Sequence, residues 1–275
     1  MNWLKYKKIY FVLSFLMIFA SAYGLLTWGL RQGIDFKGGA IVEFVSQNEV
    51  ATEDLVQNAE NLGLDDVSVQ ETDTGFIVRT SSITPQERED LSNYVFTQSE
   101  EALEVRFEEV GPSIGPDLVK KTVYALLIAS VGILLWIAIQ FKNLKYGASA
   151  ILAMLHDTFI LVGSFAFLGH FFGAEVDFLF VTALLTTLSF SVHDTIVVFD
   201  RIREIEGKSG EEFTDIANRA LSETMVRSLN NSFTIIFMLI ALVLLGGVTI
   251  KWFALALLIG TVLGTYSSPF VAVPL

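Results

Sequence analysis

Apolar residues in this chain gather into six long runs, separated by four short polar segments and one much longer one. A transmembrane helix needs roughly 20 mainly apolar residues, and every run reaches that length. The pattern therefore predicts a multi-pass α-helical membrane protein with six transmembrane helices. The predicted spans are Ile9–Leu30, Thr122–Phe141, Ala148–Phe172, Phe178–Phe199, Leu229–Val248 and Trp252–Leu275.

The pattern changes in the long segment between the first two runs. Residues 38–111 show the alternation typical of strands and the three- and four-residue spacing typical of amphipathic helices. A capping box and an early proline mark the start of the second helix. The expected elements are the strand Gly39–Val45, the helix Thr52–Leu62 with Thr52 as N-cap, the strands Asp66–Glu71 and Gly75–Thr80 joined by a turn at Thr72-Asp73-Thr74, a helix opening at Thr84-Pro85-Gln86-Glu87, and the strand Leu103–Glu109.

The order of these elements, βαββαβ, is that of a ferredoxin-like domain. We therefore expect an α+β ferredoxin-like domain between transmembrane helices 1 and 2. The chain then divides into an N-terminus with helix 1 (1–30), this domain with its connections (31–121) and helices 2 to 6 (122–275). Because the motif is widespread, it identifies no function by itself.

The first run has a second interpretation as a signal peptide. Basic residues precede an apolar stretch from Ile9 to Phe19, and Ala20-Ser21-Ala22 is a candidate cleavage site. The apolar character continues to Leu30, however, which is longer than a signal peptide requires. We therefore favour a retained transmembrane helix.

Lysine and arginine in the short connections predict the orientation of the helices, because these residues concentrate on the cytoplasmic side. The connections Gly173–Asp177 and Gly247–Lys251 hold no basic residue and one basic residue, respectively. The N-terminal segment and the other short connections contain more lysine and arginine. We therefore expect both termini in the cytoplasm and residues 31–121 outside. The basic residues that set this orientation are Lys5, Lys7, Lys8, Lys142, Lys145, Arg201, Arg203, Lys208 and Arg219.

Composition agrees with a membrane protein and excludes several function classes. Of 275 residues, 52% are hydrophobic and 17% charged, whereas a soluble domain carries about 25% charge. The absence of cysteine excludes disulfides, thiolate metal sites and thiol nucleophiles. The net charge of −12 argues against nucleic-acid binding. Residues 31–121 hold 19 acidic and 7 basic side chains, so this segment accounts for the whole excess.

Ionisable side chains inside the apolar runs are costly, and by default they mark a functional site. His156-Asp157 lies about 14 Å into the third run, and Asp194 lies roughly 9 Å inside the cytoplasmic end of the fourth, at 1.5 Å per residue. Thr187 and Ser191 share a helix face with Asp194. The fifth run opens with Arg227, and polar residues follow it at Asn230, Asn231, Ser232 and Thr234.

These residues suggest a proton relay. A carboxyl group in such a setting can be neutralised by a proton, whereas arginine stays charged and stabilises the ionised form. Asp194 would then alternate between a pair with Arg227 and a protonated state, with Asp157 as a further relay residue.

Other interpretations of these side chains remain. Asp157 and Asp194 could be structural groups bonded to Ser, Thr and His of neighbouring helices, and Arg227 could extend to the interface. An intramembrane aspartyl protease is disfavoured because no Gly-x-Gly-Asp sequence is present. A metal site is disfavoured because adjacent His and Asp diverge by about 100° on a helix. Gly260-x-x-x-Gly264 suggests close helix packing.

Three motifs in this sequence resemble the SecF family of protein-export membrane subunits. The first is Gly33-Ile34-Asp35-Phe36-Lys37-Gly38-Gly39, just outside the first run. The second runs from Ser191 to Glu204, and the third is Gly264-Thr265-Tyr266-Ser267-Ser268. Residues 227–235 match more loosely, because relatives more often have Thr where Asn231 and Ile235 stand. The motifs follow the family's order, and the six-helix layout fits essentially the whole chain.

The resemblance implies that the chain pairs with SecD in a bundle like those of the RND superfamily. The pair would join the SecYEG channel, with YajC and YidC as further partners, and use the proton motive force to move preproteins across the bilayer. The family's relay aspartate falls on Asp194 and its partner arginine on Arg227. No cofactor, metal site, nucleic-acid partner or enzymatic activity is expected. The fourth-helix motif contains His193, Thr195, Asp200, Arg201 and Arg203.

The glycine-rich first motif sits where the membrane part meets the outer domain, and glycine permits sharp backbone turns there. We hypothesise that Gly33, Asp35, Phe36, Gly38 and Gly39 couple the relay to domain movement. Two competing functions remain: half of a small-molecule or lipid exporter of the same superfamily, and a passive scaffold for a partner.

Overall fold

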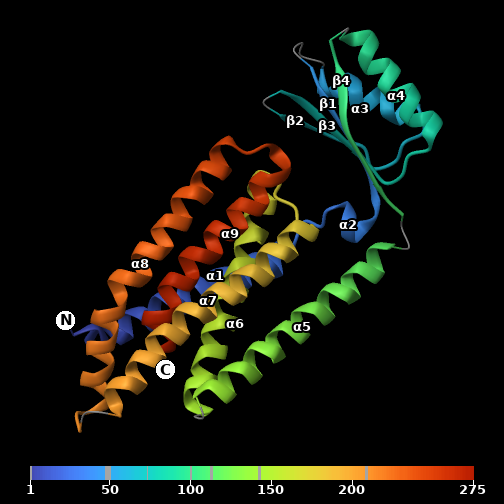
Figure 1. The fold of residues 1–275 in the computed structure, drawn as a ribbon. Coiled ribbons are helices and arrows are strands. Elements are labelled where there is room, and N and C mark those ends of the chain that lie inside the picture. Colours follow the sequence, from blue (N-terminus) through green and yellow to red (C-terminus); the bar gives the residue numbers. More distant parts are fainter. Residues whose placement is uncertain are drawn as a thin grey trace. The chain divides into compact units, whose positions relative to one another are not determined.

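The computed structural model describes residues 2–46, 51–72, 74–99, 101–111, 114–141, 144–207 and 210–275. Asp73 of the predicted hairpin turn, and Lys142 and Lys208 of the orientation prediction, lie outside these residues. The chain forms two compact units (Figure 1). We call Met1–Arg31 with Tyr124–Leu275 the membrane unit and Gln32–Val123 the sheet unit.

The membrane unit contains the long apolar helices, except for the start of the second one, which belongs to the sheet unit. Within the described residues, six helices are long and apolar enough to cross a bilayer, which confirms the predicted number. They are α1 (Lys7–Thr27), α5 (Ile114–Phe141), α6 (Leu144–Phe172), α7 (Phe178–Glu206), α8 (Phe213–Leu245) and α9 (Val248–Ser267). A short 3₁₀ turn, η1 (Trp3–Tyr6), precedes α1.

Several predicted helix ends were wrong. Helix α1 ends at Thr27 instead of Leu30, and the left-handed Gly29, with φ of +67°, follows it. Helix α8 starts at Phe213, well before Leu229, because an amphipathic stretch with buried Ile216 and Leu221 continues it beyond the apolar run. Helix α9 ends at Ser267 instead of Leu275 and passes into a π-helical turn, η2 (Ser268–Ala272).

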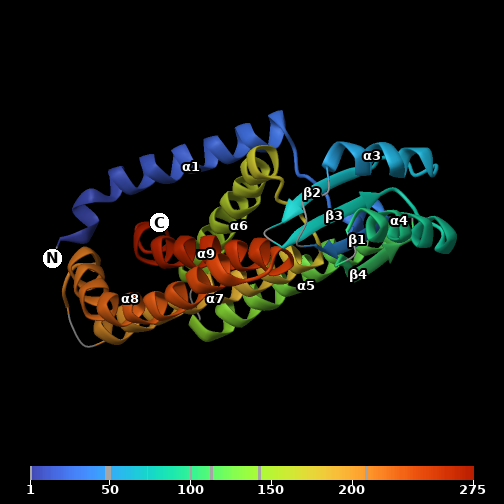
Figure 2. The ribbon, with the colours of Figure 1, turned by 90° about the horizontal axis from the view of Figure 1, so that it is seen from above.

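Helices α6, α7 and α9 form the inside of the membrane unit. In the most apolar part of each span, 50% of residues are buried in α6 and 56% in α7 and α9, against 17%, 6% and 11% in α1, α5 and α8. Figure 1 shows α7, α8 and α9 side by side, and Figure 2 shows α1 beside α6. Small residues allow the contact between α1 and α6, where a Cβ at Gly24 would meet the ring of Phe167. The outer helices expose apolar side chains that lipid can cover.

The sheet unit is a four-stranded antiparallel sheet, within the described residues, with two helices on one face (Figure 1). The strand order is β2-β3-β1-β4, so β2 and β4 are the edges. Val42 of β1 pairs with Val78 of β3 and Phe107 of β4. The elements are α2 (Ile34–Lys37), β1 (Gly39–Val45), α3 (Thr52–Asn61), β2 (Ser68–Thr72), β3 (Gly75–Thr80), α4 (Pro85–Gln98) and β4 (Leu103–Val110).

The core of the sheet unit lies between the sheet and the helices α3 and α4. Alternate residues of β1, including Val42 and Phe44, are fully buried against Leu55 of α3 and Leu91 of α4. This is the pattern expected of a sheet with one covered face.

The start of helix α3 differs from the prediction. Ala51, not Thr52, is the N-cap residue, and it makes no side-chain cap. The Thr52 hydroxyl instead donates to Glu71 Oε1 of β2 at 2.6 Å. Glu53 and Asp54 in the first turn still place negative charge at the helix N-terminus, where the helix dipole favours it.

The predicted capping box of helix α4 is confirmed. Glu87 N–H donates to the Thr84 hydroxyl at 3.3 Å, and Thr84 N–H donates to Glu87 Oε2 at 2.7 Å. The hydrogen bonds from Thr84 lower the pKa of Glu87 below its ordinary value of 4.5. The first turn of α4 is thus held by backbone–side-chain contacts at the surface.

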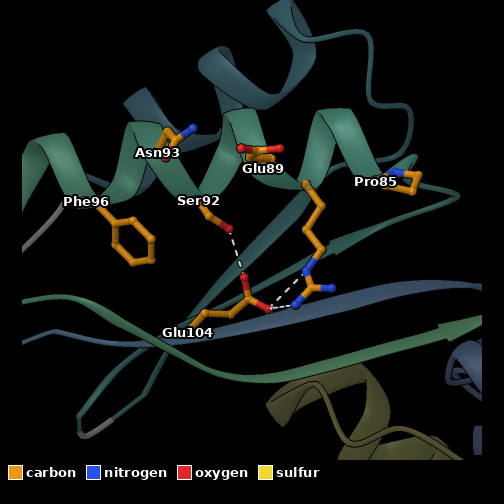
Figure 3. Close-up of a pocket in the computed structure, with 7 residues that line it drawn as sticks. Pro85, Glu89, Ser92, Asn93, Phe96 and Glu104 are labelled. Atoms are coloured by element: carbon orange, nitrogen blue, oxygen red, sulfur yellow. Dashed lines mark hydrogen bonds and ion pairs between the residues drawn. The ribbon is translucent and has the colours of Figure 1, made fainter.

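Glu104 ties the edge strand β4 to helix α4 (Figure 3). Its carboxylate accepts from Ser92 Oγ at 2.9 Å and from Arg88 Nε at 3.0 Å. Arg88 also lies over the ring of Phe107, 3.9 Å from its centroid. These groups border a surface groove of about 300 Å³, lined by Pro85, Arg88, Glu89, Ser92, Asn93, Phe96 and Glu104.

Candidate functional site

Asp157 of α6 is the point where three inner helices of the membrane unit meet. Its side chain is buried, and Oδ2 accepts hydrogen bonds from Ser191 Oγ of α7 at 2.6 Å and from Ser267 Oγ of α9. The neighbouring His156 places Nδ1 2.9 Å from the other oxygen, Oδ1. The carboxyl group of Asp157 is therefore surrounded by hydrogen-bonding groups from α6, α7 and α9.

The contact between His156 and Asp157 was not expected from the sequence. Adjacent positions on a helix point about 100° apart, and that angle argued only against convergence of the two side chains on one metal ion. Both residues are buried, however, at 7% and 6% exposure. Their side chains turn toward each other within the same space.

Two glycines of α9 allow α7 to come close enough for this arrangement. A Cβ at Gly260 would overlap the side chain of Thr187, and one at Gly264 would lie 3.1 Å from Cα of Ser191. The predicted packing role of Gly260-x-x-x-Gly264 is therefore confirmed. Further along, the hydroxyls of Thr195 and Ser268 lie 3.0 Å apart. Small residues on both helices thus form a tight, hydroxyl-rich contact.

Asp194 occupies a second buried position, farther along α7. Its side chain is 4% exposed, and its Oδ2 accepts a hydrogen bond of 2.5 Å from the Ser228 hydroxyl of α8. Arg227, the predicted partner, is exposed, and within the described residues it makes no ion pair with Asp194. The structure therefore joins Asp194 to α8 through a serine that sequence reasoning missed.

The polar residues that the sequence analysis singled out at the start of the fifth run divide into two groups. Ser232 is buried and accepts a hydrogen bond of 2.7 Å from Thr265 of α9. Asn230, Asn231 and Thr234 are exposed, as is Arg227. Ser228 and Ser232 thus bond α8 to α7 and α9, while Arg227 and the other three residues are exposed in this chain.

Of the remaining fourth-helix motif residues, Asp200, Arg201 and Arg203 form a charged rim at the end of α7. His193 is exposed, and Thr195 is bonded to the carbonyl of Ser191 at 3.0 Å. Asp200 pairs with Arg203 at 2.7 Å. Arg201 pairs with Glu223 of α8 at 2.5 Å, and Arg203 donates to the carbonyl of Gln140 of α5 at 3.0 Å. The motif therefore links α7 to two neighbouring helices.

The glycine-rich first motif surrounds α2 in the sheet unit. Gly33 caps this short helix, and Gly38 and Gly39 follow it with φ of +79° and +128°. A Cβ at Gly39 would lie 2.7 Å from the carbonyl oxygen of Thr80, and one at Gly115 would overlap the carbonyl of Phe36. Asp35 lies in the first turn of α2. The motif is thus pressed against the end of β3 and the start of α5.

Comparison with known proteins identifies the family. The family model "Protein export membrane protein SecD/SecF, C-terminal" matches residues 90–275. The protein translocase subunit SecF of Thermobaculum terrenum is 43% identical over 284 residues, which cover 97% of this chain and 90% of that protein. SecF of Anaerolinea thermophila is 36% identical, with 100% and 92% covered.

A solved structure agrees with these sequence matches. The crystal structure of SecDF, a translocon-associated membrane protein from Thermus thermophilus, matches with a TM-score of 0.88 at 29% identity. The match covers 99% of this chain but 38% of the SecDF chain. The resemblance to SecF inferred from three short motifs is confirmed, and the chain belongs to the SecD/SecF family of protein-export membrane proteins.

Proposed function

We propose that this chain is the SecF subunit of the Sec protein-export machinery, which works with SecD to promote preprotein translocation with the proton motive force. The observation that carries this proposal is Asp194, a carboxyl group buried between membrane helices with a neutral hydroxyl as its partner. Moving one charge through 100 mV supplies about 2.3 kcal/mol, enough to bias a motion between two states. This role needs no enzymatic activity.

Asp194, Arg227 and Asp157 are the proposed relay residues. In the arrangement seen here, the Ser228 hydroxyl bonds to Asp194 while Arg227, one position earlier, is exposed. A rotation of α8 would replace the hydroxyl by the guanidinium, which favours the ionised carboxylate. Protonation of Asp194 would release the guanidinium again. Asp194 and α8 together would then be the element that responds to protons.

The sheet unit is proposed to be a ferredoxin-like domain on the extracytoplasmic side, with both chain termini in the cytoplasm. The order β1-α3-β2-β3-α4-β4 supports the fold, and the basic residues of the short connections support the orientation. The glycine-rich motif at α2 is proposed to couple the relay to this domain, because it contacts both β3 and the start of α5.

SecD is the proposed direct partner. The chain matches 38% of the SecDF chain. The rest of that chain is long enough to include a second half, which we assign to SecD. The polar residues of α8 that are exposed in this chain, Arg227, Asn230, Asn231 and Thr234, are suited to face such a half within the bilayer. SecYEG, YajC, YidC and the preprotein are further proposed partners, by resemblance to the family.

The test is a pulse-chase of a secreted preprotein in cells that depend on this chain. Asp194→Asn keeps the shape of the side chain but removes its charge, and it should stop late-stage release while SecD stays associated. Asp215→Asn makes the same substitution at an exposed position of α8 and should be silent at equal membrane abundance. Normal export by the Asp194→Asn variant would overturn the relay and favour the passive scaffold.

A further inference from the structure

His156 is a buried titratable residue that the proposed relay does not use. Its side chain is 5% exposed, and Nδ1 is occupied by the contact with Asp157 at 2.9 Å. Within the described part of the chain, its other ring nitrogen, Nε2, is buried without any hydrogen-bond partner. Buried polar atoms are nearly always bonded, so an unbonded one calls for a functional explanation.

The charges around Asp157 do not balance unless His156 is included. The hydroxyls of Ser191 and Ser267 donate to the Asp157 carboxyl, and the imidazole shares a further hydrogen bond with it. Among the described residues, no lysine or arginine contacts it. A carboxylate buried without a cation is strongly unfavourable. One added proton makes the His156–Asp157 pair neutral overall, either as an imidazolium beside a carboxylate or as two neutral groups.

The other groups that face His156 cannot easily take that proton. From α9, Tyr266 places its ring centroid 6.4 Å from the imidazole. The Tyr266 hydroxyl donates to the carbonyl of Tyr10 in α1 at 2.9 Å and lies 3.2 Å from the Ser14 hydroxyl. From α7, Ser191 contacts the pair and does not titrate. The imidazole is therefore the basic group of this cluster.

We propose that His156 and Asp157 form a storage site for one proton in the middle of the membrane unit. A proton from water binds at Nε2 and converts the pair from one negative charge to neutral. The Nδ1 proton can then move along the hydrogen bond to Oδ1, which leaves both groups neutral. Return of that proton to Nδ1 and loss of the proton from Nε2 restore the first state. This inference rests on the proposed proton-coupled function.

Storage at this site would act directly on helix packing. The same carboxyl group that shares the proton also accepts the hydroxyls of Ser191 and Ser267. Hydrogen bonds to an ionised carboxylate are stronger than those to a neutral group. A proton that moves from the imidazole to Asp157 therefore loosens the ties between α6, α7 and α9. His156 is thus a positioning residue as well as a proton carrier.

The matched substitutions are His156→Asn and His170→Asn, in the full chain assembled with SecD. The asparagine amide at position 156 can still donate to Asp157 from near the place of Nδ1, but it cannot bind a proton. His170 lies on the same helix and is exposed. We expect His156→Asn to slow proton-driven export and to remove one step from its pH profile, and we expect His170→Asn to match the wild type.

Infrared spectroscopy of the same membranes gives a second readout. Without the imidazole, the neutral state requires the proton on Asp157. A protonated-carboxyl band should therefore appear in His156→Asn near neutral pH and vanish in His156→Asn/Asp157→Asn. An unchanged pH profile and no new band would overturn the storage site. If Asp194→Asn still blocks export in that case, the proposed function stands and the further inference alone fails.

His156→Gln covers the case in which the asparagine variant does not assemble. Glutamine places its amide near the position of Nε2 and gives up the contact with Asp157. It should also lose the pH step, because it too cannot bind a proton. A wild-type pH profile for His156→Gln would contradict the proposal.

Discussion

The two units of this protein place their polar and apolar side chains in opposite ways. The sheet unit keeps an apolar core around Val42 and Phe44, and its charged contacts, such as Arg88 with Glu104, lie at its margin. The membrane unit exposes apolar side chains such as Phe237, while Asp157 and Asp194 are buried inside it. The difference follows from the surroundings: water favours charge outside, whereas lipid leaves the interior as the place for polar groups.

The largest expected effect tests the apolar core of the sheet unit. Phe44 is 0% exposed, so Phe44→Ala should destabilise the sheet unit by about 3–5 kcal/mol through lost contacts and a cavity. The matched change Phe237→Ala, at a residue 69% exposed in the membrane unit, should cost less than about 0.5 kcal/mol in detergent. Hydrogen exchange of peptides from each unit measures both. Equal losses of protection would contradict the comparison.

A smaller effect is expected from the contact between α7 and α9. Gly260→Val forces a side chain into the space of Thr187, and overpacking of this kind costs about 1–3 kcal/mol. Gly132→Val is the control, because a Cβ there would meet no atom within 4 Å beyond the adjoining backbone of its own helix. Thermal unfolding in detergent should separate the two variants. If they unfold at the same temperature, the close approach of these helices is not a source of stability.

Removing one charge in each unit gives the next comparison. Glu104→Gln weakens the contacts with Arg88 and Ser92 at a partly solvated site, and we expect a loss of about 1 kcal/mol. Asp157→Asn also keeps the size of the side chain but removes a buried charge. It can still accept a hydroxyl, so we expect at most about 1 kcal/mol of change in stability. The main effect should be the loss of a titrating group in the pH profile of export.

The smallest effect concerns the capping box of α4. The pKa of Glu87 is lowered in the folded chain by hydrogen bonds from Thr84. Its contribution is therefore complete above the ordinary value of 4.5 and disappears as the pH falls through the lowered pKa. The urea midpoint of the sheet unit, followed by proteolysis with an acid-active protease, should decline in this window. Glu87→Gln should lack that part of the decline.

The sequence predicts the membrane helices and strands well because their signals are local. Hydropathy located all six spans. The alternating pattern predicted the first and last residues of both β1 and β3. Helix α8 began earlier than predicted, since its first turns bury one side of an amphipathic helix.

The site was harder to predict, because it depends on how each helix is rotated about its own axis. Hydropathy does not specify that rotation. The sequence identified Asp194 and Arg227, but Ser228 is the residue that points toward Asp194. Likewise, the meeting of His156 with Asp157 depends on the neighbours supplied by α7 and α9. Contacts between helices decide these details, and one helix considered alone cannot.

The glycines of α9 have a mechanical consequence. Thr187 sits against Gly260, and Ser191 sits against Gly264, one turn farther along. Four residues of helix rise about 6 Å. The two glycines are therefore two equivalent positions, at that spacing, where α7 can approach α9 closely. Sliding by part of a turn would press larger side chains of α9 against Thr187. We therefore expect α7 and α9 to move together as a rigid body, or to shift past each other by one whole helical turn. Intermediate positions would be sterically unfavourable.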